Sequence, residues 1–122
     1  MSGTRARHTS ENARQAKAWV NFDGTFGTSP FTEANGGIRD SFNVDSVTDI
    51  NTGRYTVNFT NNFSNTDYAV CITVGGAQNA MWFRTYEDSV ARTTSAFHFL
   101  TAQFSNGAFM DMPQINVIFF GE

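Results

Sequence analysis

The amino-acid sequence predicts an all-β fold: an antiparallel β-sandwich of jelly-roll-like type, with about seven strands and a short N-terminal arm. Aromatic residues make up 15% of the chain, and 13 of its residues are Phe, which packs well on a pleated surface. Leu occurs only at position 100, and no apolar repeat of helical period follows residue 18. Short apolar runs instead alternate with turn residues, as in antiparallel β domains.

The first half of the chain contains the clearest strand signals. We expect strands at 18–22, 38–44 and 54–60, and a tight hairpin loop at 49–53. A continuation of the second strand beyond 44, past a kink, stays open. Gly53 is expected to supply the positive φ of the hairpin loop. The strand at 54–60 alternates most regularly, which predicts that Tyr55, Val57 and Phe59 share the core-facing side.

The second half of the chain predicts four further strands, at 68–74, 80–86, 95–104 and 115–120. Nearly every position of 68–74 is apolar or small, which indicates that both faces of this strand are covered. Cys71 would then be a buried structural thiol rather than a reactive one. Phe63 lies in the loop before this strand and is expected to plug the core.

The charges divide the chain into a basic docking arm, residues 1–17, and an acidic β-sandwich domain, residues 18–122. The arm has four basic residues against one acidic residue, and the domain has four basic residues against ten acidic ones. We expect the arm to dock on an acidic neighbouring subunit through Arg5, Arg7, Arg14 and Lys17. A solvated tail is the alternative. Nucleic-acid binding is the least favoured hypothesis for the arm, because four charges are few and no aromatic residue lies among them.

No constellation of residues in the sequence indicates catalysis or metal binding. The two histidines lie far apart in the sequence, and Cys71 is the only cysteine. Asp40, Asp45, Glu87 and Asp88 are interpreted as solvated loop charges. We therefore expect no catalytic residue, metal site or cofactor, and a protein that is not an enzyme. The sequence shows neither a secretory signal nor an apolar run long enough to insert into a membrane.

A binding surface is the better hypothesis for the strand at 80–86. Asn79, Trp82, Arg84 and Tyr86 combine aromatic and polar groups suited to sugar stacking or protein contact. The alternative is that Trp82 belongs to the core or to a subunit interface.

The last two strands carry aromatic side chains on both faces. A sandwich core buries only one face of each strand, so the surplus predicts a second hydrophobic surface. We expect this surface to be the interface of a homo-oligomer, formed by Phe97, His98, Phe99, Phe119 and Phe120.

Four parts of the first 75 residues resemble a known domain. They are Lys17-Ala18-Trp19-Val20-Asn21-Phe22, Ile38-Arg39 with Ser41-Phe42-Asn43-Val44, Tyr55-Thr56-Val57-Asn58-Phe59-Thr60, and Tyr68-Ala69-Val70. They are similar to a small β domain of tailed-bacteriophage structural proteins, above all at the ends of tail fibres. The similarity covers about residues 17–75, and 80–122 matches only as a β pattern. It implies a trimeric virion part without catalytic residues.

The resemblance predicts a non-enzymatic virion structural protein of a tailed phage, a tail-fibre-like tip that is made in the host cytoplasm and exposed on the virion surface for host adhesion. A fibre carries a stalk upstream, whereas 17 residues precede the domain here. We therefore expect the arm to mount the domain directly on other virion proteins.

The alternative is a capsid decoration (cement) protein that stabilises the head shell. A carbohydrate-active enzyme is the third and least favoured hypothesis. The expected partners are two further copies in a homotrimer, other virion proteins, and a host surface glycan or protein.

Overall fold

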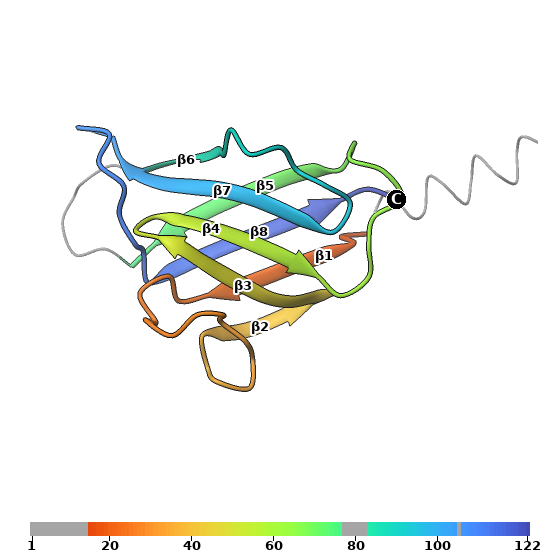
Figure 1. Ribbon diagram of the computed structural model, residues 1–122, viewed down its shortest axis with the longest axis horizontal. Helices are drawn as coiled ribbons and strands as arrows, with labels where there is room; N and C mark the ends of the chain where they lie inside the picture. Colours follow the sequence, from red (N-terminus) through yellow and green to blue (C-terminus); the bar gives the residue numbers. More distant parts are fainter. Residues whose placement is uncertain (1–14, 77–82, 105) are drawn as a thin grey trace, which may run out of the picture.

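The computed structural model describes residues 15–76, 83–104 and 106–122. This part of the chain contains eight β-strands and no helix, so no helix in it could cross a membrane. The strands are β1 (Ala18–Phe22), β2 (Ile38–Phe42), β3 (Val44–Asn51), β4 (Arg54–Phe59), β5 (Ala69–Gly75), β6 (Phe83–Glu87), β7 (Ala96–Gln103) and β8 (Gln114–Phe120). The predicted antiparallel β-sandwich is confirmed, with one strand more than expected (Figure 1).

Two four-stranded antiparallel sheets lie face to face (Figure 1). The first sheet has the strand order β2-β1-β8-β5, and the second has the order β3-β4-β7-β6. The chain crosses from one sheet to the other after β2, β4, β5 and β7. The edge strands are therefore β2 and β5 in the first sheet and β3 and β6 in the second.

The core between the sheets is made largely of aromatic rings. The ring of Tyr55 lies 5.3 Å from that of Phe22 and 5.6 Å from that of Phe99, centroid to centroid. Burial of one such side chain contributes about 1.5–3 kcal/mol, so these rings dominate the stability of the fold. The predicted inward face of β4 is confirmed, because Tyr55, Val57 and Phe59 are all buried. Phe63 is buried in the same core, as expected.

Asn43 is the reason that eight strands form. The sequence predicted one strand over 38–44, with a continuation left open, but the backbone turns at Asn43, whose φ is +57°. There the chain leaves the first sheet as β2 and enters the second as β3. The Asn43 side chain donates to the Lys17 and Asn61 carbonyls and accepts the Asn61 N–H. Asn tolerates this left-handed conformation better than most residues.

The β3–β4 hairpin is tighter than the predicted loop at 49–53. β3 continues to Asn51, so only Thr52 and Gly53 connect the two strands. Gly53 has the predicted positive φ, +70°. A Cβ atom here would lie 2.5 Å from the Thr101 carbonyl oxygen, so close packing also requires glycine.

The prediction that both faces of the strand at 68–74 are covered is wrong within the single chain. β5 is an edge strand of the first sheet, and none of its residues is buried. Cys71 is accordingly exposed rather than buried. A strand of apolar residues has the same composition at the edge of a sheet as in its centre. The sequence therefore could not show that β5 is an edge strand.

Candidate functional site

An aromatic patch with a central cation lies on the outer face of the second sheet. Phe83 packs against the core, so its neighbours in alternation, Arg84 and Tyr86, point outward from β6. The Arg84 guanidinium lies 5.6 Å from the Tyr86 ring centroid and 5.5 Å from that of Phe104. Both distances are within cation–π range. Tyr86 is 38% exposed and Phe104 is 54% exposed.

The strand register adds Phe109 to this surface. Arg84 pairs with Ala102 of β7, and Ala102 forms a bridge with Phe109, which is half exposed. Ala102 itself is fully buried. The aromatic patch therefore consists of Arg84, Tyr86, Phe104 and Phe109. It presents a guanidinium with five N–H donors among aromatic faces, a combination that suits carboxylates, sugar rings and protein loops.

Two of the four residues predicted for a binding surface thus lie together and exposed: Arg84 and Tyr86. Asn79 and Trp82 lie outside the described residues. Phe104 was predicted to end a strand but was not predicted to lie beside Arg84. Its proximity to Arg84 depends on the register between β6 and β7, which the sequence does not specify.

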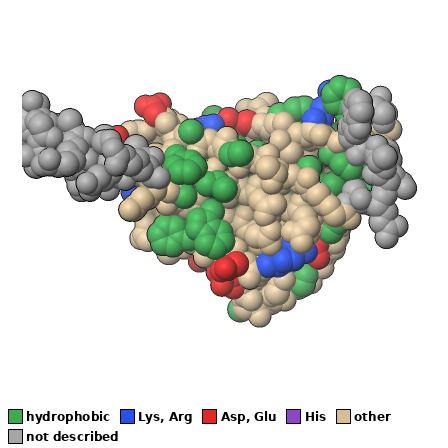
Figure 2. Space-filling model, turned by 180° about the vertical axis from the view of Figure 1, so that it is seen from behind, with side chains coloured by type: hydrophobic (Ala, Val, Ile, Leu, Met, Phe, Trp, Pro, Cys, Tyr) green, Lys and Arg blue, Asp and Glu red, His purple; other side chains and the backbone are tan. Residues whose placement is uncertain are grey.

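A row of apolar side chains crosses the outer face of the first sheet. Phe42, Trp19, Ile118 and Cys71 are directly opposite one another on β2, β1, β8 and β5. We call these four residues the apolar row. Figure 2 shows hydrophobic side chains gathered over one half of the face that it views. Such a contiguous apolar surface commonly contacts another molecule.

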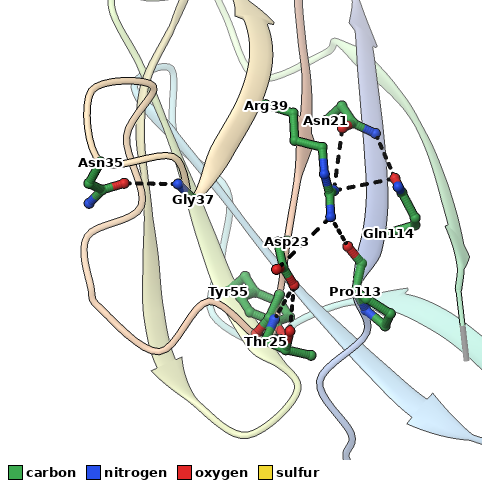
Figure 3. A network of polar contacts seen from close by, with 10 residues as sticks. Asn21, Asp23, Thr25, Asn35, Gly37, Arg39, Tyr55, Pro113 and Gln114 are labelled. Carbon is green, nitrogen blue, oxygen red and sulfur yellow. Dashed lines mark hydrogen bonds and ion pairs between the residues drawn. The ribbon is translucent and has the colours of Figure 1, made fainter.

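A polar network occupies the other half of this outer face. Arg39 donates from Nη1 to Gln114 Oε1 at 3.3 Å and from Nη2 to the Pro113 carbonyl at 2.8 Å (Figure 3). Asn21 also donates to Gln114 at 3.1 Å and contacts Asn116. These side chains hold one another in place across β1, β2 and β8.

Of the four residues predicted for arm docking, Lys17 lies in the described part of the chain. Arg5, Arg7 and Arg14 lie outside the described residues. Lys17 belongs to the edge of the sandwich, because its N–H donates to the Phe119 carbonyl at 2.8 Å and its ammonium lies 6.0 Å from the Phe63 ring centroid. A groove of about 530 Å³ lies beside it, lined by Gln15, Ala16, Lys17, Phe42, Asn43, Thr60 and Asn61. The groove therefore adjoins the apolar row where the arm joins the sandwich.

Three residues of the predicted oligomer interface are not surface residues. Phe97, Phe99 and Phe119 are at most 1% exposed and belong to the core. We had predicted that these side chains face a partner subunit. They point inward instead, and the opposite sheet of the same chain covers them. His98 is half-buried, with Nδ1 2.8 Å from the Thr56 hydroxyl. Phe120 alone is substantially exposed, at 39%.

Glu87 and Asp88 each form an ion pair with an arginine, and the Asp88 side chain is only 8% exposed whereas that of Glu87 remains 39% exposed. Arg92 donates to both Glu87 carboxylate oxygens, at 2.7 and 2.8 Å, and lowers the pKa of that carboxyl. Arg54 donates to Asp88 at 2.9 Å and lowers its pKa in the same way. Both acids therefore stabilise strand-to-loop contacts.

A second acid pair, Asp49 and Asp111, was not found from the sequence. Burial, with a further contribution from Asp111, raises the pKa of Asp49. Asp49 Oδ1 is buried without a hydrogen-bond partner among the described residues. Within this same part of the chain, no group of three or more His, Cys, Asp and Glu side chains is placed to hold a metal ion. No local pattern indicates this pair, because its members are 62 positions apart in the sequence.

Comparisons with protein-family models, with curated proteins and with solved structures each find no match to this chain. Inferences about its function therefore depend on its own residues, their geometry and the resemblance described above.

Proposed function

We propose that this chain is a non-enzymatic virion surface protein of a tailed phage, whose β-sandwich is a tail-fibre-like tip for host adhesion. The observation that carries the adhesive role is the Arg84 guanidinium placed between the exposed rings of Tyr86 and Phe104. The virion role is supported by the resemblance over residues 17–75. The two supports are independent, so each is tested by its own experiment.

The aromatic patch is suited to recognition because its cation is oriented before a ligand arrives. The two rings restrict the Arg84 side chain, so less rotamer entropy is lost when its N–H groups bind an acceptor. The rings themselves offer flat apolar surface to a sugar or to an aliphatic side chain. Acidic surface glycans combine both features, and we propose them as the class of receptor.

Adhesion can be tested by binding of the fluorescently labelled, purified protein to a panel of bacterial strains and to immobilised acidic polysaccharide. Arg84→Ala and Phe104→Ala should each weaken binding at least tenfold, equivalent to about 1.4 kcal/mol. Phe42→Ala is the matched control, because Phe42 is also 54% exposed but lies on the opposite sheet. Equal losses for Phe104→Ala and Phe42→Ala would contradict the assignment of the patch. Release of reducing ends from the polysaccharide would contradict a non-enzymatic role.

Capsid decoration is the second candidate, and the apolar row with its adjoining groove favours it. This surface lies beside Lys17, where the arm meets the sandwich, and on the opposite sheet from the aromatic patch. A cement protein would press this face onto the shell. Purified protein should then bind expanded phage heads and raise their melting temperature, and Phe42→Ala should reduce that gain while Phe104→Ala leaves it unchanged.

Under either role, we propose that the arm mounts the domain on other virion proteins. Removal of residues 2–14 should abolish incorporation into virions, whereas the sandwich should keep its melting temperature. Normal incorporation of the truncated protein would contradict the docking role of Arg5, Arg7 and Arg14.

A further inference from the structure

The two open sides of the sandwich are completed differently. On the side of β2 and β3, the loop between β1 and β2 closes the core. Phe31 of this loop is fully buried and exchanges two backbone hydrogen bonds with Val47 of β3, at 2.8 and 3.0 Å. Phe26 packs against it with a centroid distance of 5.9 Å. This side therefore has both an apolar cover and a partner for its edge strand.

On the side of β5 and β6, burial of the core is incomplete. Val70, Ile72 and Val74 of β5 point inward, as does Phe83 of β6, yet all four remain only half-buried. Among the described residues, no strand pairs with the outer edge of β5. A strand edge without a strand partner is a template for pairing with a further strand.

β5 also lacks the features that protect the other edge strands. Such features are charged side chains, prolines and bulges. β2 carries Arg39 and Asp40, β3 carries Asp45 and two register shifts, and β6 carries Arg84 and Glu87. β5, with the sequence Ala-Val-Cys-Ile-Thr-Val-Gly, has no charge and no proline, and its seven pairs with β8 run without a register shift.

We infer that a second copy of this chain pairs with β5 through its own β5, antiparallel and across a two-fold axis. Antiparallel pairing across a two-fold axis sets each residue opposite the one that lies equally far on the other side of the centre. In any such register β5 brings no charged side chain into the contact, whereas each of the other three edges does. A pair centred on Ile72 would also set Val70 opposite the partner's Val74, so the half-buried side chains would cover one another.

The pairing would join two first sheets into one continuous sheet of eight strands. This inference goes beyond adhesion and does not depend on a virion role. It also differs from the trimer that the resemblance implies. A two-fold contact produces a pair, whereas a trimer needs two different surfaces on each subunit.

Sedimentation velocity of the full chain tests the inference directly. The wild type should sediment as a dimer, and Thr73→Lys should sediment as a monomer, because a lysine on an edge strand opposes pairing. Thr52→Lys is the matched control, since Thr52 is also exposed but lies in the β3–β4 turn, and it should remain dimeric. Thr73→Val loses the hydroxyl bonded to Asn116 without adding charge, so it should also remain dimeric. Melting curves establish that all four proteins are folded.

Cys71 provides a second readout in the native sequence. In a pair centred on Ile72, the two Cys71 residues are diagonal neighbours, about 7–8 Å apart. A short bismaleimide should therefore convert the wild type into a covalent dimer, and Cys71→Ser and Thr73→Lys should give none. A monomeric wild type, a trimer, or a dimer that survives Thr73→Lys without Cys71 cross-linking would each overturn the inference.

Discussion

The Tyr55 hydroxyl donates to Asp111 Oδ1 at 2.6 Å, at one end of the aromatic core. The same oxygen accepts the Gly53 N–H at 2.7 Å. Asp111 thus joins the β3–β4 turn, the inward face of β4 and the segment that precedes β8. Burial, followed by the hydrogen bond to Asp111, raises the pKa of Tyr55 and keeps the hydroxyl protonated as the donor.

Tyr55→Phe should destabilise the protein by about 1.5–3 kcal/mol, because a buried hydrogen bond to a charged group is lost. The free energy of unfolding from urea titration measures this change. Tyr86→Phe is the matched control, because Tyr86 is exposed on the outer face, and its stability should equal that of the wild type. Equal effects of the two substitutions would show that the Tyr55–Asp111 bond contributes nothing.

Asp49→Asn should stabilise the protein at neutral pH by about 1 kcal/mol, because it removes the charge of a half-buried carboxylate whose Oδ1 is buried without a partner among the described residues and which is repelled by Asp111. The raised pKa in the folded state means that folding favours protonated Asp49. The wild type therefore gains stability as the pH falls through that raised pKa. The advantage of Asp49→Asn should accordingly vanish well below pH 3.8, the ordinary pKa of the group.

Asp45→Asn, at an exposed position on the same strand, is the matched control and should leave stability at neutral pH unchanged. Chemical denaturation at several pH values compares the two variants. A loss of stability in Asp49→Asn at neutral pH would contradict the prediction.

Acid should weaken the contacts of Glu87 and Asp88 with their arginines. Their hydrogen bonds to Arg92 and Arg54 lower both pKa values in the folded state. Their contribution is therefore complete above the ordinary values of 4.5 and 3.8 and is lost as the pH falls through the lowered ones. The double variant Glu87→Gln/Asp88→Asn should show a shallower fall of melting temperature with acid than the wild type, and an equally steep fall would contradict the prediction.

Gly53→Ala should be far more destabilising than Gly27→Ala. Both glycines have a positive φ, +70° and +89°, so alanine is strained at either position, by about 1–2 kcal/mol. At Gly53 the added methyl group would also lie 2.5 Å from the Thr101 carbonyl oxygen, whereas at Gly27 the nearest atom is 3.9 Å away. The urea midpoint of Gly27→Ala measures the backbone strain alone, and the further decrease in Gly53→Ala measures the steric clash with Thr101. Equal midpoints would show that this clash costs nothing.

Local patterns predicted the strands well where one face was buried. The alternation in β4 identified Tyr55 as core, and Gly53 identified the turn. The boundary at Asn43 was missed because a single left-handed residue moved the chain between sheets. The candidate site was predicted in part, since Arg84 and Tyr86 are neighbours in one strand. Phe104 joins them only through the pairing of β6 with β7.

The sequence by itself determined that this chain forms antiparallel strands, because alternation and turn residues act over a few positions. Tertiary structure decided which apolar faces are covered. Phe97 and Phe119 became core because a second sheet lies over them, whereas Cys71 became exposed because β5 ends its sheet. Burial depends on the partner of a strand as much as on the strand itself, and that partner is set by contacts between residues far apart in the chain.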